Sequence, residues 1–443
     1  MGKDLSPPIS FPYNHGVALA VNAISDAYMI LDGPGCSFYR AMQIHGRHDW
    51  TSTMLSCDGD HRFQYAGIDA NKLASRVAEM ISGVISHVAQ IEKCGAVIVT
   101  SLPMCTIAGT DHSSILKLAA QGKPAFAVHG TSLTGDWHDG FANALRTIAE
   151  EIDLPDAKKN KDNVAIIGHF MDRGEGDHRG NLSEFKRMLE ALGLNLVSVW
   201  PCGGTLEELK EVRRAGIVVS LPHARRAGEI LAGRLGAKLI ETEIPFGLSA
   251  SQAWIRRIGK AVNRMKRAET FIETELDRIV PLLEWAIPFT FMNKKVVFYG
   301  DPYHLAGMKD VCNDLGMTLS WSFLMGRKPE GASDERAEFD IHLTHLRARW
   351  KELLKNKEAD FIIGNTDCMS QLKPSLPWME FGFPSVWRHC LKEEPFLGFN
   401  GFLALVDRMT HALLGRKAVS SWTSVTLDKS ASAEPAAESA TVK

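Results

Sequence analysis

Residues 96–105 read AVIVTSLPMC, an apolar β-branched run that ends in two small polar residues and is followed closely by a cysteine. A continuous apolar run of this length, without alternation, is typical of a strand that is buried on both faces, as strands of parallel sheets are. Seven further runs share this pattern: AYMILDG (27–33), PAFAVHG (124–130), VAIIGHF (164–170), NLVSVWP (195–201), GIVVSLP (216–222), KVVFYGD (295–301) and DFIIGNT (360–366). The sequence therefore predicts parallel sheet along most of the chain.

Amphipathic segments lie between these strands. Apolar residues recur at three- and four-residue spacing in RVAEMISGVISHVAQIE (76–92), and FKRMLEALG (185–193) closes with glycine. A longer amphipathic helix is expected over 254–284. Strand, helix and strand in alternation predict an α/β fold, here three doubly wound, Rossmann-like parallel-sheet units.

The unit boundaries follow two breaks in this alternation. KKNKDN (158–163) is a polar linker before a fresh strand, and the second break lies near 285–294. We expect an N-terminal unit over 1–157, a middle unit over 158–288 and a C-terminal unit over 289–416. The tail, 417–443, is rich in Ala, Ser and Glu and is predicted to be disordered, because it has too little apolar surface to bury.

Composition narrows the class of protein. Of 443 residues, 45% are hydrophobic and 23% charged, which is typical of a soluble globular chain. The net charge of -2 gives no reason to expect nucleic acid as a partner. Because no secretory signal and no apolar stretch of about 18 residues is present, we expect no membrane association and a cytoplasmic location.

Two cysteines follow predicted strands. Cys36 lies in LDGPGCSFYR, on a turn made by two glycines and a proline, and Cys105 lies in SLPMCTIAGTD. A cysteine at such a place is a metal ligand, a nucleophile with a neighbouring base, or a buried structural residue. Thiolates select soft metals and iron–sulfur clusters, and two of them do not complete a site. A partner chain or further residues must then supply the rest.

Cys57, in LSCDGDHRFQYAGID, is a third candidate metal ligand. The neighbouring Asp58 and Asp60 would raise the pKa of its thiol, which disfavours a free reactive thiol and leaves ligation or burial. The Gly-rich run 168–181 matches neither the dinucleotide fingerprint nor the P-loop, so we expect no nucleotide site on this chain.

The order of these motifs resembles the beta-type subunits of nitrogenase and of nitrogenase-like reductases. The resemblance covers nearly the whole chain. It is carried by GPGCSFYRAMQIHGRH (33–48), LSCDGDHRFQYAGIDANKL (55–73), SLPMCTIAGTD (101–111), IPFGLSASQAW (244–254), KKVVFYGDPYHLAGMKDVCNDLGM (294–317), ADFIIGNTDCMSQL (359–372) and FGFPSVWRHC (381–390) with LGFNGFLALVDRMTHALL (397–414).

That resemblance implies an oxidoreductase complex. It pairs the chain with a homologous alpha-type subunit in a heterotetramer, in which an iron–sulfur relay cluster bridges the two chains. The cluster would be of the [8Fe-7S] P-cluster type or a [4Fe-4S] cluster. An ATP-hydrolysing homodimeric iron protein docks on the pair, and electrons pass to a catalytic cluster in the alpha-type subunit. The resemblance places cluster ligands at Cys36 and Cys105, and iron-protein docking around Tyr65, Ala66 and Gly67.

One departure from the family pattern leaves the third ligand open. Phe11 stands where nitrogenase beta chains carry their first ligand cysteine. Either Cys57 substitutes, or a non-thiolate ligand does, or the bridging cluster differs from the eight-iron type. In HGTSLTGDW, Thr131 and Ser132 lie near the place where the family can offer a hydroxyl ligand.

Chain length and loop sequence are most similar to the methylthio-alkane reductases, which cleave carbon–sulfur bonds of small methylthio compounds reductively. The alternatives are the beta-type chain of a tetrapyrrole or dinitrogen reductase, or a scaffold subunit on which a cofactor is assembled. A small-molecule binding protein built from the same α/β units is a third class.

Overall fold

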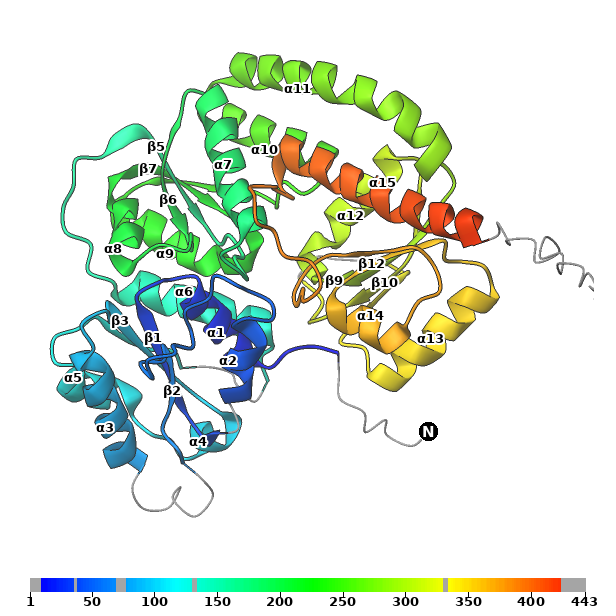
Figure 1. Cartoon of the computed structure of the whole chain (residues 1–443). Helices are drawn as coiled ribbons and strands as arrows, with labels where there is room; N and C mark the ends of the chain where they lie inside the picture. The colour runs from blue at the N-terminus through cyan, green and yellow to red at the C-terminus, as the bar shows by residue number, and fades with distance from the viewer. Residues whose placement is uncertain (1–8, 36–37, 69–76, 130–133, 330–333, 424–443) are drawn as a thin grey trace, which may run out of the picture.

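The computed structural model describes residues 9–35, 38–68, 77–129, 134–329 and 334–423. Within these residues the strands form three sheets, and every pair of neighbouring strands is parallel. Helices pack around each sheet, and Figure 1 shows the three sheets as separate bodies. The predicted α/β fold with three Rossmann-like units is confirmed.

The N-terminal sheet has the strand order β2-β1-β3-β4. All residues of β1 and β3 are buried, which explains their continuous apolar sequences. The strands are β1 (Ala27–Asp32), β2 (Phe63–Tyr65), β3 (Ala96–Ser101) and β4 (Ala125–Ala127). The helices are α1 (Tyr13–Asn22), α2 (Phe38–Ile44), α3 (Val77–Gln90), α4 (Pro103–Ile107), α5 (His112–Ala119) and α6 (Trp137–Glu151).

The middle sheet has the order β6-β5-β7-β8, so the strand order reverses between β5 and β7. Its strands are β5 (Asn160–Ile167), β6 (Asn195–Trp200), β7 (Ala215–Ser220) and β8 (Lys238–Glu241). Its helical segments are α7 (Gly176–Ala191), α8 (Leu206–Leu209), η2 (Lys210–Arg214), η3 (Pro222–Ala224), α9 (Arg225–Leu235), α10 (Leu248–Ala261), α11 (Met265–Ala286) and the π-helical turn η4 (Ile287–Phe291). Because β5 begins at Asn160, most of the polar run expected as a linker, residues 160–163, is part of a strand.

The C-terminal sheet has the order β11-β10-β9-β12-β13, with its reversal between β9 and β12. Its strands are β9 (Lys295–Gly300), β10 (Thr318–Leu324), β11 (Ala337–Phe339), β12 (Phe361–Gly364) and β13 (Trp378–Glu380). Its helical segments are η5 (Pro302–His304), α12 (Leu305–Asp314), α13 (Leu343–Lys355), α14 (Thr366–Leu372) and α15 (Gly398–Thr423).

All eight predicted strands are present, and five further strands were not predicted. The unpredicted strands are β2, β8, β10, β11 and β13. Four of them lie at sheet edges, where one side of the strand has no neighbour in its sheet as described. Partly exposed residues interrupt the apolar run in β8, β10 and β11. The continuous apolar signal is therefore weakest in strands whose sequence is interrupted by partly exposed residues.

The prediction of one helix over 254–284 was wrong. The structure has two helices, α10 and α11, separated by a turn at 262–264. Asn263 adopts a left-handed conformation there, with φ of 58°, which an α-helix cannot contain. The Arg264 amide donates to the Gly259 carbonyl (2.7 Å), and a Cβ on Gly259 would lie 2.8 Å from Ala268. The apolar period continues across the turn, so periodicity alone did not show it.

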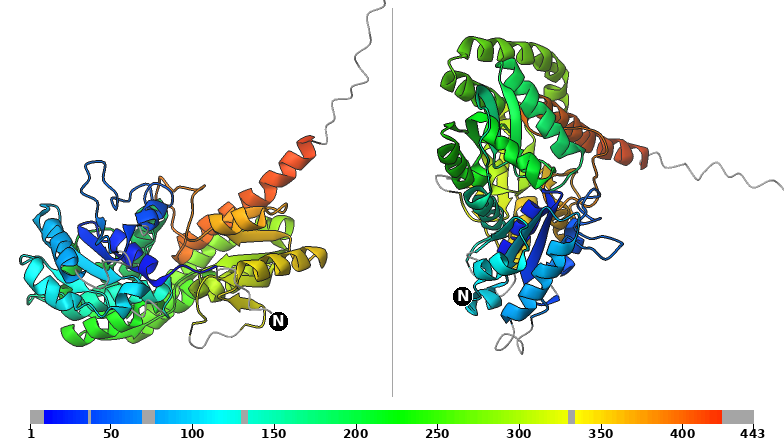
Figure 2. Two further views of the ribbon diagram at one scale, coloured as in Figure 1. Left: turned by 90° about the horizontal axis from the view of Figure 1, so that it is seen from below. Right: turned by 90° about the vertical axis from the view of Figure 1, so that its left-hand side faces the viewer.

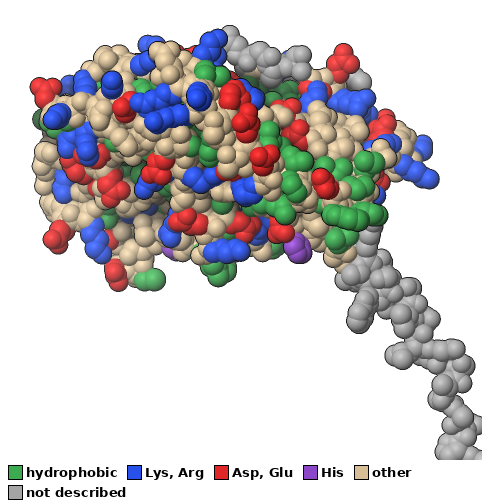
Figure 3. All heavy atoms as spheres, turned by 90° about the horizontal axis from the view of Figure 1, so that it is seen from above, with side chains coloured by type: hydrophobic (Ala, Val, Ile, Leu, Met, Phe, Trp, Pro, Cys, Tyr) green, Lys and Arg blue, Asp and Glu red, His purple; other side chains and the backbone are tan. Residues whose placement is uncertain are grey.

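The last helix, α15, leaves the C-terminal sheet and packs against α7, α10 and α11 of the middle unit. It runs past residue 416, where the disordered tail was expected to begin, and 424–443 lie outside the described residues. Figure 2 shows its end pointing away from the body, and Figure 3 shows apolar side chains beside that end. None of the helices in the described ranges is long and apolar enough to cross a membrane.

Helices α1 and α6 approach so closely that only glycine fits at two contacts. A Cβ on Gly16 would lie 1.6 Å from the Trp137 carbonyl oxygen, and one on Gly140 would lie 1.9 Å from the Tyr13 carbonyl oxygen. Helix α1 is buried along its whole length. This pair therefore brings backbone against backbone and carries the start of α6 towards the C-terminal unit, where the Trp137 indole donates to the Met325 carbonyl (2.8 Å).

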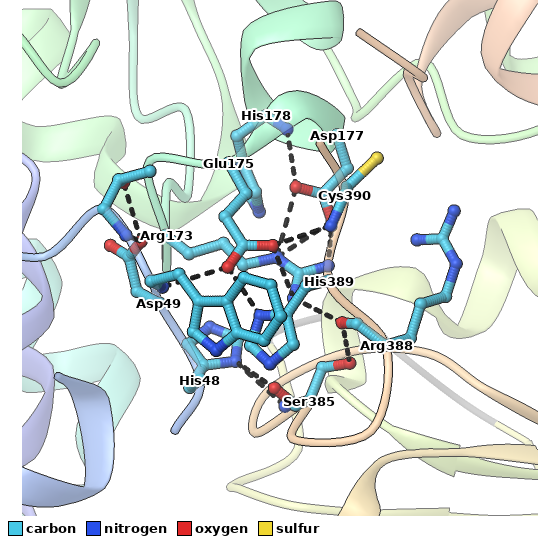
Figure 4. A network of polar contacts seen from close by, with 12 residues as sticks. His48, Asp49, Arg173, Glu175, Asp177, His178, Ser385, Arg388, His389 and Cys390 are labelled. Atoms are coloured by element: carbon cyan, nitrogen blue, oxygen red, sulfur yellow. Dashed lines mark hydrogen bonds and ion pairs between the residues drawn. The ribbon is translucent and has the colours of Figure 1, made fainter. Parts of the chain in front are cut away.

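A buried polar network joins the three units (Figure 4). The Glu175 carboxylate accepts hydrogen bonds from the amide of Trp50 (3.0 Å) and the amide of Cys390 (2.8 Å), and contacts His389 Nδ1 (2.7 Å). Glu175 belongs to the middle unit, Trp50 to the N-terminal unit, and Cys390 and His389 to the C-terminal unit. The indole of Trp50 stacks on His389, with ring centroids 3.7 Å apart.

The same network contains a buried ion pair. Arg173 Nε donates to both carboxylate oxygens of Asp177 (3.1 and 3.0 Å), and Arg173 Nη1 donates to the Arg388 carbonyl (3.0 Å). Although burial opposes ionisation, the Arg173 guanidinium lowers the pKa of Asp177 below its usual value. Such a pair contributes little net energy when it is complete, but removal of one partner leaves a buried charge without compensation.

We expect alanine at Gly16 to destabilise the protein, because its methyl group would overlap the Trp137 carbonyl. Overpacking of this kind costs about 1–3 kcal/mol or more. Gly233→Ala is the matched control, since Gly233 lies within α9 with open space around its Cβ position. That variant should be neutral or stabilising by roughly 0.5–1 kcal/mol. Thermal and urea unfolding measure both. Equal melting temperatures for the two variants would contradict the close approach.

Arg173→Met should destabilise the protein by about 3–5 kcal/mol, because it leaves the Asp177 and Glu175 carboxylates buried without their cation. The control is Arg256→Met, which removes an equally well-formed but solvent-exposed pair with Glu269 and should cost less than about 1 kcal/mol. Urea titration gives both values. Similar losses of unfolding free energy in the two variants would show that burial does not determine the cost of breaking the Arg173 pair.

Candidate functional site

The first candidate site lies where the strand order of the N-terminal sheet reverses, between β1 and β3. These strands are parallel and in register from Ala27 with Ala96 to Asp32 with Ser101. Both therefore end at one edge, and the loops that follow them start side by side. A Cβ on Gly33 would lie 2.5 Å from Leu102 Cδ1. Ligands of doubly wound sheets bind at the carboxyl edge, at such a reversal.

Cys105 lies at this edge, buried in α4 directly after β3. Burial and the neighbouring Asp32 carboxylate raise the pKa of its thiol to about 12. Asp32 Oδ2 lies 2.9 Å from His112 Nε2, at the start of α5. Its other oxygen, Oδ1, is buried without a hydrogen-bond partner among the described residues. A soft sulfur and a buried carboxylate thus lie together at the reversal.

The chemistry of this pair favours a metal over nucleophilic catalysis. A thiol with a pKa near 12 stays protonated at neutral pH and is a poor nucleophile. A bound cation reverses this, because it holds sulfur as thiolate and offsets the adjacent carboxylate. Cys105 therefore fits a ligand of an iron–sulfur cluster better than a reactive cysteine.

Two predicted ligands, Cys36 and Thr131, lie outside the described residues, as does Ser132. The residues next to them lie at the same edge as Cys105. A Cβ on Gly35 would lie 2.9 Å from the ring of Tyr65. His129 follows β4, and its Nε2 lies 3.0 Å from the Ser113 hydroxyl of α5. Gly35 and His129, the last described residues before these positions, thus lie at the edge that holds Cys105.

Cys57 does not lie with Cys105. It is exposed, and its neighbours Ser56 and Asp58 line a hollow of about 320 Å³ together with Ser25 and Lys93. Ser25 precedes β1 and Lys93 precedes β3, so this hollow lies at the amino edge of the sheet. Cys105 lies at the opposite, carboxyl edge. The structure therefore gives no support to Cys57 as a ligand shared with Cys105 in one chain.

Phe11, where the family pattern led us to expect a cysteine, belongs to an aromatic cluster. Its ring lies edge-on to Trp137 (5.6 Å between centroids) and to Phe383 of the C-terminal unit (5.0 Å). It therefore packs the start of the chain against another unit. A hydrocarbon ring has no lone pair to offer a metal.

The carboxyl edge of the N-terminal sheet also carries exposed apolar side chains. Tyr65, Met104 and Ile107 are exposed, and Ile107 keeps 73% of its surface accessible. Met104 and Ile107 flank Cys105 within α4, and Tyr65 ends β2. The predicted docking residues 65–67 therefore lie at the edge that holds Cys105, as Figure 1 also shows for β2 and α4.

A second cluster of candidate ligand side chains lies at the junction of the three units, and sequence reasoning missed it. His138 is the second residue of α6, His223 follows β7 and Asp301 follows β9, and all three are buried. Each stands alone in the sequence, so no ligand spacing marks it. The only available signal was the position of His223 and Asp301 directly after predicted strands.

Comparison with known proteins agrees with this geometry. Residues 13–414 match the model of the family described as "Nitrogenase component 1 type Oxidoreductase". The molybdenum-iron protein beta chain of Clostridium pasteurianum nitrogenase is 24% identical over 344 residues, 67% of this chain and 69% of the relative. The B subunit of light-independent protochlorophyllide reductase from Chlorobium limicola is 26% identical over 258 residues, 52% of this chain and 47% of the relative.

A solved structure of nitrogenase Cp1 at pH 6.5 superposes with a TM-score of 0.78 at 18% identity, covering 94% of each chain. This likeness shows the common fold. The predicted resemblance to nitrogenase-like, beta-type chains is confirmed, whereas its narrower form, a methylthio-alkane reductase, stays a prediction. Because the family model matches well over half of this chain, the chain belongs to the nitrogenase component 1 type oxidoreductases.

Proposed function

We propose that this chain is the beta-type subunit of a nitrogenase-like reductase complex that holds an iron–sulfur relay cluster between itself and an alpha-type subunit. Cys36 and Cys105 are the ligands from this chain. The observation that carries the proposal is the place of Cys105: a buried thiol at the strand-order reversal of the N-terminal sheet, beside the buried carboxylate of Asp32.

The surface around Cys105 supports a site that is shared with another chain. Met104 and Ile107 are apolar and exposed on both sides of Cys105. Clustered exposed apolar side chains are typical of a surface that another protein covers. A homologous chain seated there would bury these side chains and bring its own ligands to the edge. The third ligand, missing at Phe11, would then come from the partner, or from the segment that contains Thr131.

Within this proposal the chain's own groups have separate roles. Cys105 and Cys36 hold the cluster, which when bound supplies one-electron transfer. The contact of Asp32 with His112 fixes the carboxylate beside the Cys105 sulfur. The segment around Tyr65, Ala66 and Gly67 offers the surface on which an ATP-hydrolysing iron protein docks. The complex would be a cytoplasmic heterotetramer.

For the reaction we propose reductive cleavage of a carbon–sulfur bond in small methylthio compounds, carried out at a catalytic cluster in the alpha-type subunit. The support is the similarity of chain length and loop sequence to methylthio-alkane reductases. A specific observation favours an alternative, since a light-independent protochlorophyllide reductase is among the relatives. The beta-type chain of a tetrapyrrole reductase is therefore the second candidate.

Cys105→Ala should remove the relay-cluster signal from low-temperature EPR of the purified complex and abolish electron delivery, because the cluster loses a thiolate. Cys94→Ala is the matched control: Cys94 is also buried beside β3, and burial also raises the pKa of its thiol, but it precedes the strand at the amino edge. The control should keep the signal and the iron content of the wild-type complex.

An unchanged cluster signal in Cys105→Ala, with the fold intact by circular dichroism, would refute the ligand assignment. Equal losses in Cys105→Ala and Cys94→Ala would mean that any cavity in this sheet disturbs the cluster.

The substrate is tested with the anaerobic complex, its iron protein, ATP and a reductant. We expect sustained release of methanethiol or hydrocarbon from methylthioethanol or dimethyl sulfide, in amounts that exceed the enzyme. Protochlorophyllide reduction without thiol release would favour the tetrapyrrole alternative. No turnover of either substrate, together with transfer of an assembled cluster to a recipient protein, would identify an assembly scaffold.

A further inference from the structure

The strand-order reversals of the middle and C-terminal sheets are occupied by histidine and aspartate. His223 follows β7, at the reversal between β5 and β7, and Asp301 follows β9, at the reversal between β9 and β12. The same rule that places Cys105 at a ligand-binding edge applies to both. His138, at the start of α6, reaches the same point from the N-terminal unit. Three units thus contribute one side chain each.

The spacing of these side chains suits a shared ion. His223 Nε2 lies 3.0 Å from Asp301 Oδ2, and His138 Nε2 lies 3.2 Å from Asp301 Oδ1. One ligand atom from each residue lies within 4.8 Å of the other two. Ligands bound to a single zinc or iron ion at about 2.0–2.2 Å lie roughly 3–3.5 Å apart. The exposed fractions of the His138, His223 and Asp301 side chains are 7%, 3% and 7%, so bulk water does not compete.

Hydrogen bonds within the cluster do not satisfy it. His138 Nε2 is fully buried, and its polar neighbour in the described structure is the Asp301 carboxylate, 3.2 Å away. His304 Nδ1, 3.7 Å from the same carboxylate, is also buried without a hydrogen-bond partner among the described residues. Buried polar atoms are normally well paired, and an ion held between these imidazoles and the carboxylate would complete their contacts.

Two features complete such a site. The Tyr303 amide donates to Asp301 Oδ1 (2.8 Å) and orients the carboxylate, as outer groups do around metal ligands. A cavity of about 40 Å³ is lined by Asp301 and His304 of this group, together with Trp137 and Phe170. This volume holds a water molecule or a few, which could fill the remaining coordination positions.

We propose that His138, His223 and Asp301 bind one divalent first-row transition-metal ion, zinc or ferrous iron, at the junction of the three units. Two imidazoles and one carboxylate suit these ions and leave positions open for water or His304. The site is separate from the edge of the N-terminal sheet that holds Cys105, since α4 and β9 lie well apart in Figure 1. It uses no cysteine.

Crystals of the complex with its alpha-type partner, grown from protein expressed with zinc and iron, test the site directly. We expect an anomalous difference peak between the three ligand atoms in wild-type crystals, and data on both sides of the zinc and iron absorption edges identify the metal. His223→Gln should lose the peak. It should also bind one metal ion fewer per chain by elemental analysis and melt at a lower temperature.

His178→Gln is the matched control, because His178 is equally buried and pairs with Asp172 at 2.7 Å but does not belong to the three-residue cluster. It should keep the peak and the metal content. Asp301→Asn, which keeps the side-chain shape, is the second test variant in case His223→Gln fails to fold. It should lose both the peak and the bound metal. Wild-type crystals without a peak at this position would overturn the proposal, whatever the variants do, and the EPR signal of the relay cluster would be unaffected by that result.

Discussion

Parallel pairing of buried strands is the constraint on which the rest of this molecule depends. In a parallel sheet every strand ends at the same edge, so residues far apart in the sequence meet there without any contact between their neighbours. Asp32 lies opposite Ser101 in the N-terminal sheet, and Ile167 lies opposite Ser220 in the middle one. The loops that follow these residues begin at one edge. Cys105, His223 and Asp301 are all placed in this way.

Contacts between the three units fix how their sheets are arranged relative to one another. The glycine contacts of α1 with α6 bring the start of α6 to the C-terminal unit, and with it His138. The buried Glu175 carboxylate accepts hydrogen bonds from the backbone amides of Trp50 and Cys390, and the buried Arg173 guanidinium donates to the Arg388 carbonyl. Such charges contribute little net stability, but they allow few arrangements, because each wrong one leaves a buried charge unpaired. They therefore hold the junction in one geometry.

The two candidate sites differ in chemistry because they differ in surroundings. The carboxyl edge of the N-terminal sheet carries the Cys105 sulfur among exposed apolar side chains, which suits an iron–sulfur cluster shared with another chain. The junction carries nitrogen and oxygen ligands beside aromatic rings, buried between units of this one chain, which suits a single borderline ion. A site completed by a partner must lie at the surface, whereas a site completed within the chain need not.

The sequence by itself determined the fold class, eight of the strands and the presence of Cys105 at a strand end. These follow from local patterns, since a strand buried on both faces must be continuously apolar and a tight turn must contain small residues. The left-handed turn at Asn263, the place of Cys57 at the wrong edge and the meeting of His138, His223 and Asp301 were decided only by the tertiary structure. The turn is hidden from the sequence by an apolar period that continues across it. No local pattern encodes the other two features, because each depends on which edge, or which other unit, a segment reaches after folding.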